Sequence, residues 1–187
     1  MLHHSGYFPV SIQLVFETHS ISTDNERGMA TGWLPGELSE TGRRLAAELG
    51  QRRRGEPIAA VFTSDLRRAL ETAQLAFGDA GIPIYQDARL RECNYGDWNG
   101  MPVARLDAER ARRVDDPFPN GESYRQAVER VRAFLDELPR HWDGTTLVLI
   151  GHSATRWALD HLLNGAPLEQ LVAAPFNWQP GWRYVLI

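Results

Sequence analysis

The sequence has almost no cysteine, no long apolar run and no single basic tract, and each absence removes a class of protein. Cys93 is the only cysteine among 187 residues, so no disulfide can form within the chain, and we expect a reducing compartment. No stretch approaches the ~20 apolar residues of a membrane span. Residues 1–10 also lack the basic segment and apolar run of a secretory leader. We therefore expect a cytoplasmic protein.

Charge and histidine spacing narrow the expected partners. The chain carries 20 basic and 24 acidic residues, a net charge of -4, and its arginines are spread along the expected helices. This distribution favours neither nucleic acid nor a membrane surface as a partner. No His-x-x-x-His pattern and no paired cysteines occur, so we predict neither a metal site nor another cofactor. We expect a small molecule as the partner.

Length and the alternation of apolar segments predict one α/β domain. At 187 residues, the chain 1–187 fits a single domain with a sizeable core. Short apolar runs typical of strands alternate with amphipathic segments, which predicts a three-layer α/β/α sandwich with a mostly parallel central sheet. A charged segment at 101–121 is expected to form a small cap. The expected strands are 11–16, 58–63, 82–85, 145–150 and 182–187, and the expected helices are 43–53, 65–77, 122–138 and 154–163.

Two histidines lie where an apolar strand gives way to a polar turn. His19 follows the run that contains Phe16, and His152 follows the run that contains Ile150. In an open α/β sheet, ligands collect at the carboxyl ends of the strands, so both imidazoles can reach one small anion. Either histidine alone could simply cap a strand end. Together they favour a phosphate pocket.

Five short motifs occur in order along most of the chain. They are Thr18-His19-Ser20 with Ser22 and Asn25, Ser64-Asp65 with Arg68, Glu92 with Gly96, Gly121-Glu122-Ser123, and Gly151-His152-Ser153. The ordered set resembles the histidine phosphatase superfamily, branch 1, whose fold is phosphoglycerate-mutase-like. The first signature of that family is Arg-His-Gly, followed by Glu or Gln, then Thr and Asn. Each motif alone is weak evidence, but the ordered set is specific.

The resemblance implies a role for each of four side chains. His19 would be the nucleophile, which requires a neutral imidazole whose other nitrogen donates a hydrogen bond. His152 and Arg68 would hold the phosphoryl oxygens, which the planar guanidinium matches well. Glu92 would protonate the leaving oxygen and then accept a proton from the attacking water, unless it is a structural carboxylate paired with an arginine. The expected substrate-binding residues are Thr18, Ser20, Ser22, Asn25 and Ser153.

The chain departs from the family pattern at Thr18, which stands in place of the first arginine. Threonine offers one hydroxyl and no charge. Loss of a charged hydrogen bond to phosphate costs about 1.5–3 kcal/mol, which lowers the rate by roughly ten- to a few hundredfold. Glu17 adds to this cost, because its carboxylate repels phosphate unless an arginine neutralises it. The arginines expected to compensate are Arg27, Arg91 and Arg156.

Two classes of function stay open. We favour a metal-independent phosphatase that hydrolyses a small phosphomonoester through phosphohistidine on His19. The alternative is a phosphate-ester-binding or regulatory protein on the same fold. The resemblance makes a phosphoglycerate-type mutase less expected, because mutases of that family generally carry longer insertions after the Glu92 motif. Here only about twenty residues separate Gly100 from Gly121, and a short cap admits water. The expected partner is a small phosphorylated metabolite; the sequence fixes neither the natural substrate nor the oligomeric state, for which a dimer is one option.

Overall fold

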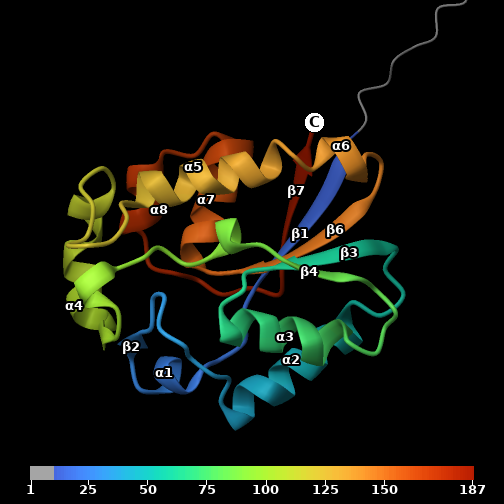
Figure 1. The fold of residues 1–187 in the computed structure, drawn as a ribbon, viewed down its shortest axis with the longest axis horizontal. Helices are drawn as coiled ribbons and strands as arrows, with labels where there is room; N and C mark the ends of the chain where they lie inside the picture. Colours follow the sequence, from blue (N-terminus) through green and yellow to red (C-terminus); the bar gives the residue numbers. More distant parts are fainter. Residues whose placement is uncertain (1–10) are drawn as a thin grey trace, which may run out of the picture.

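A computed structural model describes residues 11–187 and has a five-stranded central sheet (Figure 1). The strand order is β4-β3-β6-β1-β7, and only β7 runs antiparallel to its neighbour. This confirms the predicted α/β class with a mostly parallel sheet. Residues 1–10, the segment that lacks the pattern of a secretory leader, lie outside the described residues. The strands are β1 (Ile12–Thr18), β3 (Ile58–Thr63), β4 (Ile84–Gln86), β6 (Thr146–Gly151) and β7 (Trp182–Leu186).

Helices cover both faces of the sheet, which gives the three expected layers (Figure 1). One face carries α2 (Glu40–Arg52) and α3 (Arg67–Phe77). The other carries α5 (Tyr124–Leu135) and α7 (Ser153–Asn164). Two of these helices start where a hydroxyl caps them: Ser39 Oγ accepts from Gly42 N, and Ser123 Oγ accepts from Gln126 N. Ser39, which the sequence also indicates as a helix cap, places the start of α2 at Glu40, three residues before the amphipathic run 43–53.

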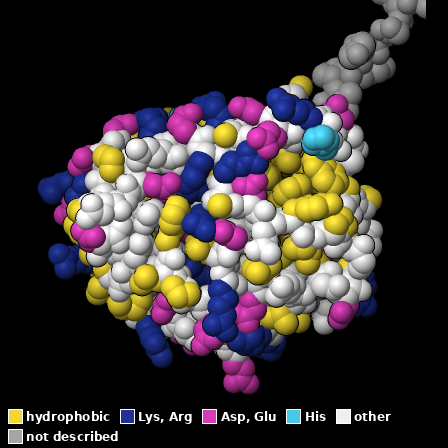
Figure 2. Space-filling view, viewed as in Figure 1, with side chains coloured by type: hydrophobic (Ala, Val, Ile, Leu, Met, Phe, Trp, Pro, Cys, Tyr) yellow, Lys and Arg dark blue, Asp and Glu magenta, His cyan; other side chains and the backbone are white. Residues whose placement is uncertain are grey.

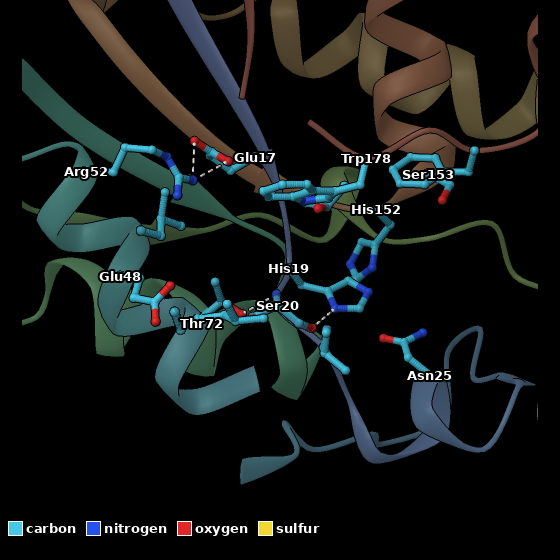
Figure 3. Close-up of a pocket in the computed structure, with 16 residues that line it drawn as sticks. Glu17, His19, Ser20, Asn25, Glu48, Arg52, Thr72, His152, Ser153 and Trp178 are labelled. Carbon is cyan, nitrogen blue, oxygen red and sulfur yellow. Dashed lines mark hydrogen bonds and ion pairs between the residues drawn. The ribbon is translucent and has the colours of Figure 1, made fainter. Parts of the chain in front are cut away.

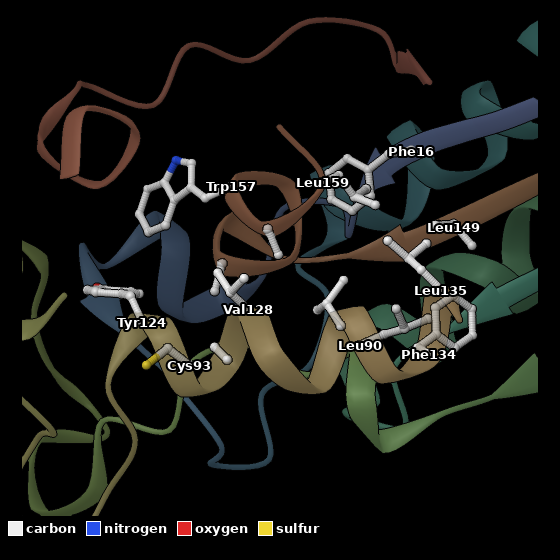
Figure 4. Close-up of a cluster of buried hydrophobic side chains, with 14 of the residues drawn as sticks. Phe16, Leu90, Cys93, Tyr124, Val128, Phe134, Leu135, Leu149, Trp157 and Leu159 are labelled. Carbon is white, nitrogen blue, oxygen red and sulfur yellow. The ribbon is translucent and has the colours of Figure 1, made fainter. Parts of the chain in front are cut away.

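The core is split by the sheet because successive strand residues point to opposite faces. On β1, Phe16 packs under α5 and α7, whereas Val15 packs under α2 and α3. On β6, Leu149 and Ile150 divide in the same way. Figure 4 shows the larger cluster, in which Phe134 of α5 lies near Leu149. Both central strands are therefore buried on two sides, which is typical of parallel strands.

The register of β1 and β6 brings the two histidines together. These strands pair in parallel with Thr18 opposite Gly151. The residue directly after each strand is a histidine, and the His19 amide donates to the Gly151 carbonyl at 2.9 Å. Both imidazoles therefore start from the same edge of the sheet.

Several short elements connect the strands and large helices, and two of them, α4 (Val103–Glu109) and η3 (Arg110–Arg113), lie in the expected cap. A two-stranded sheet joins β2 (Met29–Ala30) to β5 (Met101–Pro102). In the expected cap, Leu106 and Phe118 are buried in the larger core cluster. The other short elements are α1 (Thr23–Glu26), η1 (Ala88–Leu90), η2 (Gly96–Trp98), α6 (Pro139–Trp142) and α8 (Leu168–Ala173).

The surface shows charges of both signs interspersed on the face drawn in Figure 2. Apolar side chains gather there near β4 and α6, where Tyr85 is 45% exposed and its ring packs against Phe62 and Trp142. Within residues 11–187, no helix has the length and apolar character needed to cross a membrane.

Candidate active site

His19 lies just beyond the end of β1 with its ring fixed by a backbone contact. Its Nδ1 is 2.7 Å from the Ser20 carbonyl oxygen. Because a carbonyl only accepts, Nδ1 carries the proton and Nε2 is unprotonated. Burial, followed by the charge of Arg68, lowers the pKa of His19 from 6.5 to about 3. The ring is thus neutral near pH 7, as a nitrogen nucleophile must be.

Arg68, in the first turn of α3, reaches both histidines although it is only 2% exposed. Its Nε donates to His19 Nε2 at 3.2 Å, and its Nη2 contacts His152 Nδ1 at 3.3 Å and the Gly32 carbonyl at 2.9 Å. Its buried Nη1 has no hydrogen-bond partner among residues 11–187. The neighbouring Arg67 is 60% exposed and pairs with Glu37. Arg68 therefore offers an unused donor beside the histidine pair.

His152 faces His19 across the site (Figure 3), and the two ring centroids are 5.0 Å apart. This meets the expectation that both imidazoles reach one oxyanion-sized volume. The His152 Nδ1 must accept from Arg68, because guanidinium only donates, so its proton lies on Nε2, 2.7 Å from Ser64 Oγ. Burial, and then the charge of Arg68, lowers the pKa of His152 well below its usual value.

Glu92 lies between η1 and η2 and is 8% exposed. Its Oε1 accepts from the amides of Cys93 at 2.8 Å and Ala154 at 3.2 Å. No side chain in the described part of the chain hydrogen-bonds to Oε2. Arg91, a partner considered in the structural alternative, pairs with Asp65 instead, with 2.7 Å between Nε and Oδ1. One carboxylate oxygen is anchored and the other is left for a proton.

Two cavities border the histidine pair, and His19, Asn25 and Ser153 line both of them. The smaller, about 110 Å³, also touches Arg68 and Glu92. The larger, about 500 Å³, extends from Thr18 towards α2. In the range 11–187, no three His, Cys, Asp or Glu side chains are grouped as metal ligands would be.

The predicted substrate-binding residues divide into two groups. Thr18, Ser20, Asn25 and Ser153 line the cavities, but Ser22 does not, since it is fully buried and its Oγ accepts from the Asn25 amide at 3.1 Å. Ser22 therefore acts as the cap of α1. Its own amide donates to Asn25 Oδ1 at 3.0 Å, which leaves the Asn25 Nδ2 free to face the site. The Ser20 hydroxyl is also engaged, with the Gly42 carbonyl at 2.7 Å.

The arginines expected to compensate for Thr18 do not line either cavity. Arg91 is held by Asp65, and Arg156 Nε lies 3.3 Å from Asp160 while its guanidinium covers the Trp182 ring. Arg52 and Arg110 line the cavities instead. Sequence reasoning missed both, because a run of arginines and a charged segment do not show which side chain turns inward.

Glu17 meets the condition set for it, because arginines neutralise it. It is 2% exposed, and its Oε1 accepts from Arg53 Nε at 3.0 Å and Nη2 at 2.5 Å. Arg52 Nη2 approaches both carboxylate oxygens at 3.3 Å. The carboxylate beside Thr18 is therefore compensated from the side of α2 (Figure 3).

Known proteins match the chain along most of its length. Phosphoserine phosphatase 1 of Hydrogenobacter thermophilus is 29% identical over 85% of this chain and 79% of its own. A 2,3-bisphosphoglycerate-dependent phosphoglycerate mutase of a Methylobacterium species is 32% identical over 84% of this chain and 83% of its own. The solved structure of Bacillus stearothermophilus YhfR is 30% identical, with a TM-score of 0.79 over 93% of this chain and 90% of its own.

A protein-family model matches the part of the chain that contains the strands and loops of the site. Residues 15–179 match the family described as histidine phosphatase superfamily (branch 1). This range contains His19, Arg68, Glu92 and His152, the four side chains that converge at the carboxyl ends of β1 and β6. The chain belongs to branch 1 of the histidine phosphatase superfamily.

Proposed function

We propose that the protein hydrolyses a small phosphomonoester through phosphohistidine on Nε2 of His19. One observation carries the proposal: the hydrogen bond from Nδ1 to Ser20 leaves Nε2 unprotonated and within 3.2 Å of the Arg68 Nε donor. A lone pair beside phosphate-binding donors is the arrangement that nucleophilic phosphoryl transfer needs.

The reaction would take place in two steps. Nε2 of His19 attacks phosphorus while the bond to the leaving oxygen breaks and Glu92 delivers its proton to that oxygen. Water then attacks phosphorus, gives its proton to Glu92 and breaks the P–N bond, which releases inorganic phosphate. Arg68 donates to the phosphoryl oxygens in both steps, where negative charge is highest. His152 would donate to them in the tautomer that carries its proton on Nδ1, with Nε2 then accepting from the Ser64 hydroxyl.

Hydrolysis is favoured over transfer to a second substrate by the access of water. The larger cavity borders His19, and its rim includes Trp178 and Ile21, which are 62% and 36% exposed. Chain length does not separate the two reactions, because the matched mutase is covered over 83% of its own length. The phosphoserine phosphatase likeness supports hydrolysis of a monoester.

The test measures phosphate release from an aryl phosphate at mildly acidic pH, with and without EDTA. We expect slow turnover that EDTA does not abolish, loss of activity in His19→Ala, and retention in His141→Ala, which removes an exposed histidine from α6. When the substrate carries a labelled phosphoryl group and the reaction is quenched during turnover, the enzyme should retain label that acid releases, as expected for phosphohistidine. A His19→Ala variant as fast as the parent would refute the nucleophile. Tight phosphate binding without turnover would support the phosphate-binding protein instead.

A further inference from the structure

The larger cavity has a shape and lining that phosphoryl transfer does not need. It shares His19, Asn25 and Ser153 with the smaller cavity, in which Arg68 and Glu92 would meet the transferred group. From there it extends between α2 and the segment 174–181, and its volume is about 500 Å³. A volume of this size falls within the roughly 300–1,000 Å³ of small-molecule sites. Apolar side chains line much of it, namely Ile21, Leu45, Ala46, Leu49, Phe176 and Trp178.

Thr18 keeps this cavity open next to the histidines. It is the last residue of β1 and lines the cavity beside His19. An arginine at this position would carry a guanidinium several atoms further into the same space. The departure from the family signature therefore removes one charge and leaves room for part of a ligand.

The charges around the cavity are already paired. Glu17 is held by Arg53 and Arg52, and Glu48 pairs with Arg44 at 2.6 Å. Arg52 therefore faces a carboxylate on its cavity side and is not free for a second phosphate or carboxylate. An uncharged group fits this lining best, since burying an unpaired charge is costly.

Trp178 supplies a surface for a flat ring. Its indole is 62% exposed and lies over the same side of the site as the two histidines (Figure 3). Aromatic rings gain about 0.5–1.5 kcal/mol by stacking or edge contacts beyond the area that they bury.

We propose that this cavity binds the leaving group, and that the preferred substrates are phosphomonoesters of neutral aromatic alcohols. The inference rests on the proposed hydrolysis, because it assigns the alcohol part of the ester whose phosphoryl group meets His19. Trp178 and Leu45 act as specificity-determining residues, and neither touches the reacting atoms.

The kinetic test compares 1-naphthyl phosphate with O-phosphoserine. Trp178→Ala should raise KM for the naphthyl ester by about three- to tenfold and leave KM for phosphoserine within about twofold. Leu45→Glu, which places a charge on the half-buried apolar wall, should have the same selective effect. Tyr85→Ala is the matched control, since it removes a half-exposed ring on β4 that lines neither cavity. Equal effects on both esters, or no effect on either, would overturn the proposal.

A binding measurement separates this inference from the proposed function. Calorimetry with 1-naphthylmethylphosphonate, which cannot be hydrolysed, should give binding that Trp178→Ala weakens and Tyr85→Ala does not. If the phosphonate binds in this way but the protein releases no phosphate from either ester, the proposed hydrolysis is wrong and the proposed aromatic site stands. If both esters are hydrolysed with equal kcat/KM and Trp178→Ala does not change the affinity for the phosphonate, the proposed aromatic site is wrong and the proposed hydrolysis stands.

Discussion

Ser64 Oγ and His152 Nε2 lie 2.7 Å apart, and both residues are almost fully buried. Since Nδ1 of His152 accepts from Arg68, the Nε2 proton has Ser64 as its acceptor. This hydroxyl sets which nitrogen of His152 faces the site. The motif that contains Ser64 and Arg68 therefore orients the second histidine from two sides.

Ser64→Ala should lower both stability and activity. The buried Nε2–H of His152 would lose its acceptor, which should reduce the free energy of unfolding by about 1–3 kcal/mol. Urea unfolding and kcat/KM measure the two effects. In a His152→Ala background the same change should cost much less, because the two residues act as a pair. Fully additive losses would show that the contact does not matter.

Glu92→Gln should reduce the rate of hydrolysis more for esters with poor leaving groups than for esters with good ones. A general acid contributes roughly 10²–10⁴-fold when the leaving oxygen needs a proton. We expect kcat for an alkyl phosphate to fall by about a hundredfold or more, and kcat for p-nitrophenyl phosphate by less than about tenfold. Glu129→Gln, which alters an exposed carboxylate on α5, is the control. An equal decrease in kcat for both esters would show that Glu92 is not the proton donor.

Thr18→Arg should have opposite effects on two kinds of ester. With O-phosphoserine, the new charge beside the phosphoryl oxygens should raise kcat/KM by roughly tenfold or more. With 1-naphthyl phosphate, the longer side chain should fill the cavity and cancel that gain. The ratio of the two kcat/KM values measures the change. No gain on either ester, with unchanged rates in Arg27→Ala, Arg91→Ala and Arg156→Ala, would favour the phosphate-binding protein.

The stability of the fold should decrease in acid because His19 is buried in its neutral form. The unfolded chain binds a proton below pH 6.5, whereas folded His19 does so only near pH 3. Between these values the stability contribution falls as pH falls, by about 1.4 kcal/mol per pH unit. Urea unfolding at pH 7.5 and 5 should show a smaller loss for His19→Gln than for the parent and for the surface variant His141→Gln. Equal losses in all three would contradict the burial effect.

The sequence predicted the sheet and the histidine pair because both depend on local patterns. Runs such as Leu147–Ile150 are apolar throughout and bounded by polar residues, so the strand and its end are visible along the chain. The convergence of His19 and His152 then follows from parallel pairing at neighbouring strands.

Features set by distant contacts were not visible. The two-residue strands β2 and β5 exist only because the chain brings Ala30 beside Met101, and no periodicity can show pairs that short. Ser22 looked like a ligand residue but its hydroxyl caps α1. The expected strand 82–85 starts later, at Ile84, because Pro83 has no amide to donate to the sheet.

The buried Nη1 of Arg68, with no partner among the described residues, has a consequence for how stability is measured. An oxyanion that binds the folded protein there, and not the unfolded chain, raises the apparent stability by RT ln(1 + [L]/Kd). Phosphate or sulfate buffers would therefore raise the melting temperature of the parent and inhibit turnover at the same time. In variants of His19, Arg68 or His152, the melting temperature should rise less with phosphate concentration than it does in the parent. Thermal shift across phosphate concentrations thus reports on the anion site even where no substrate is known.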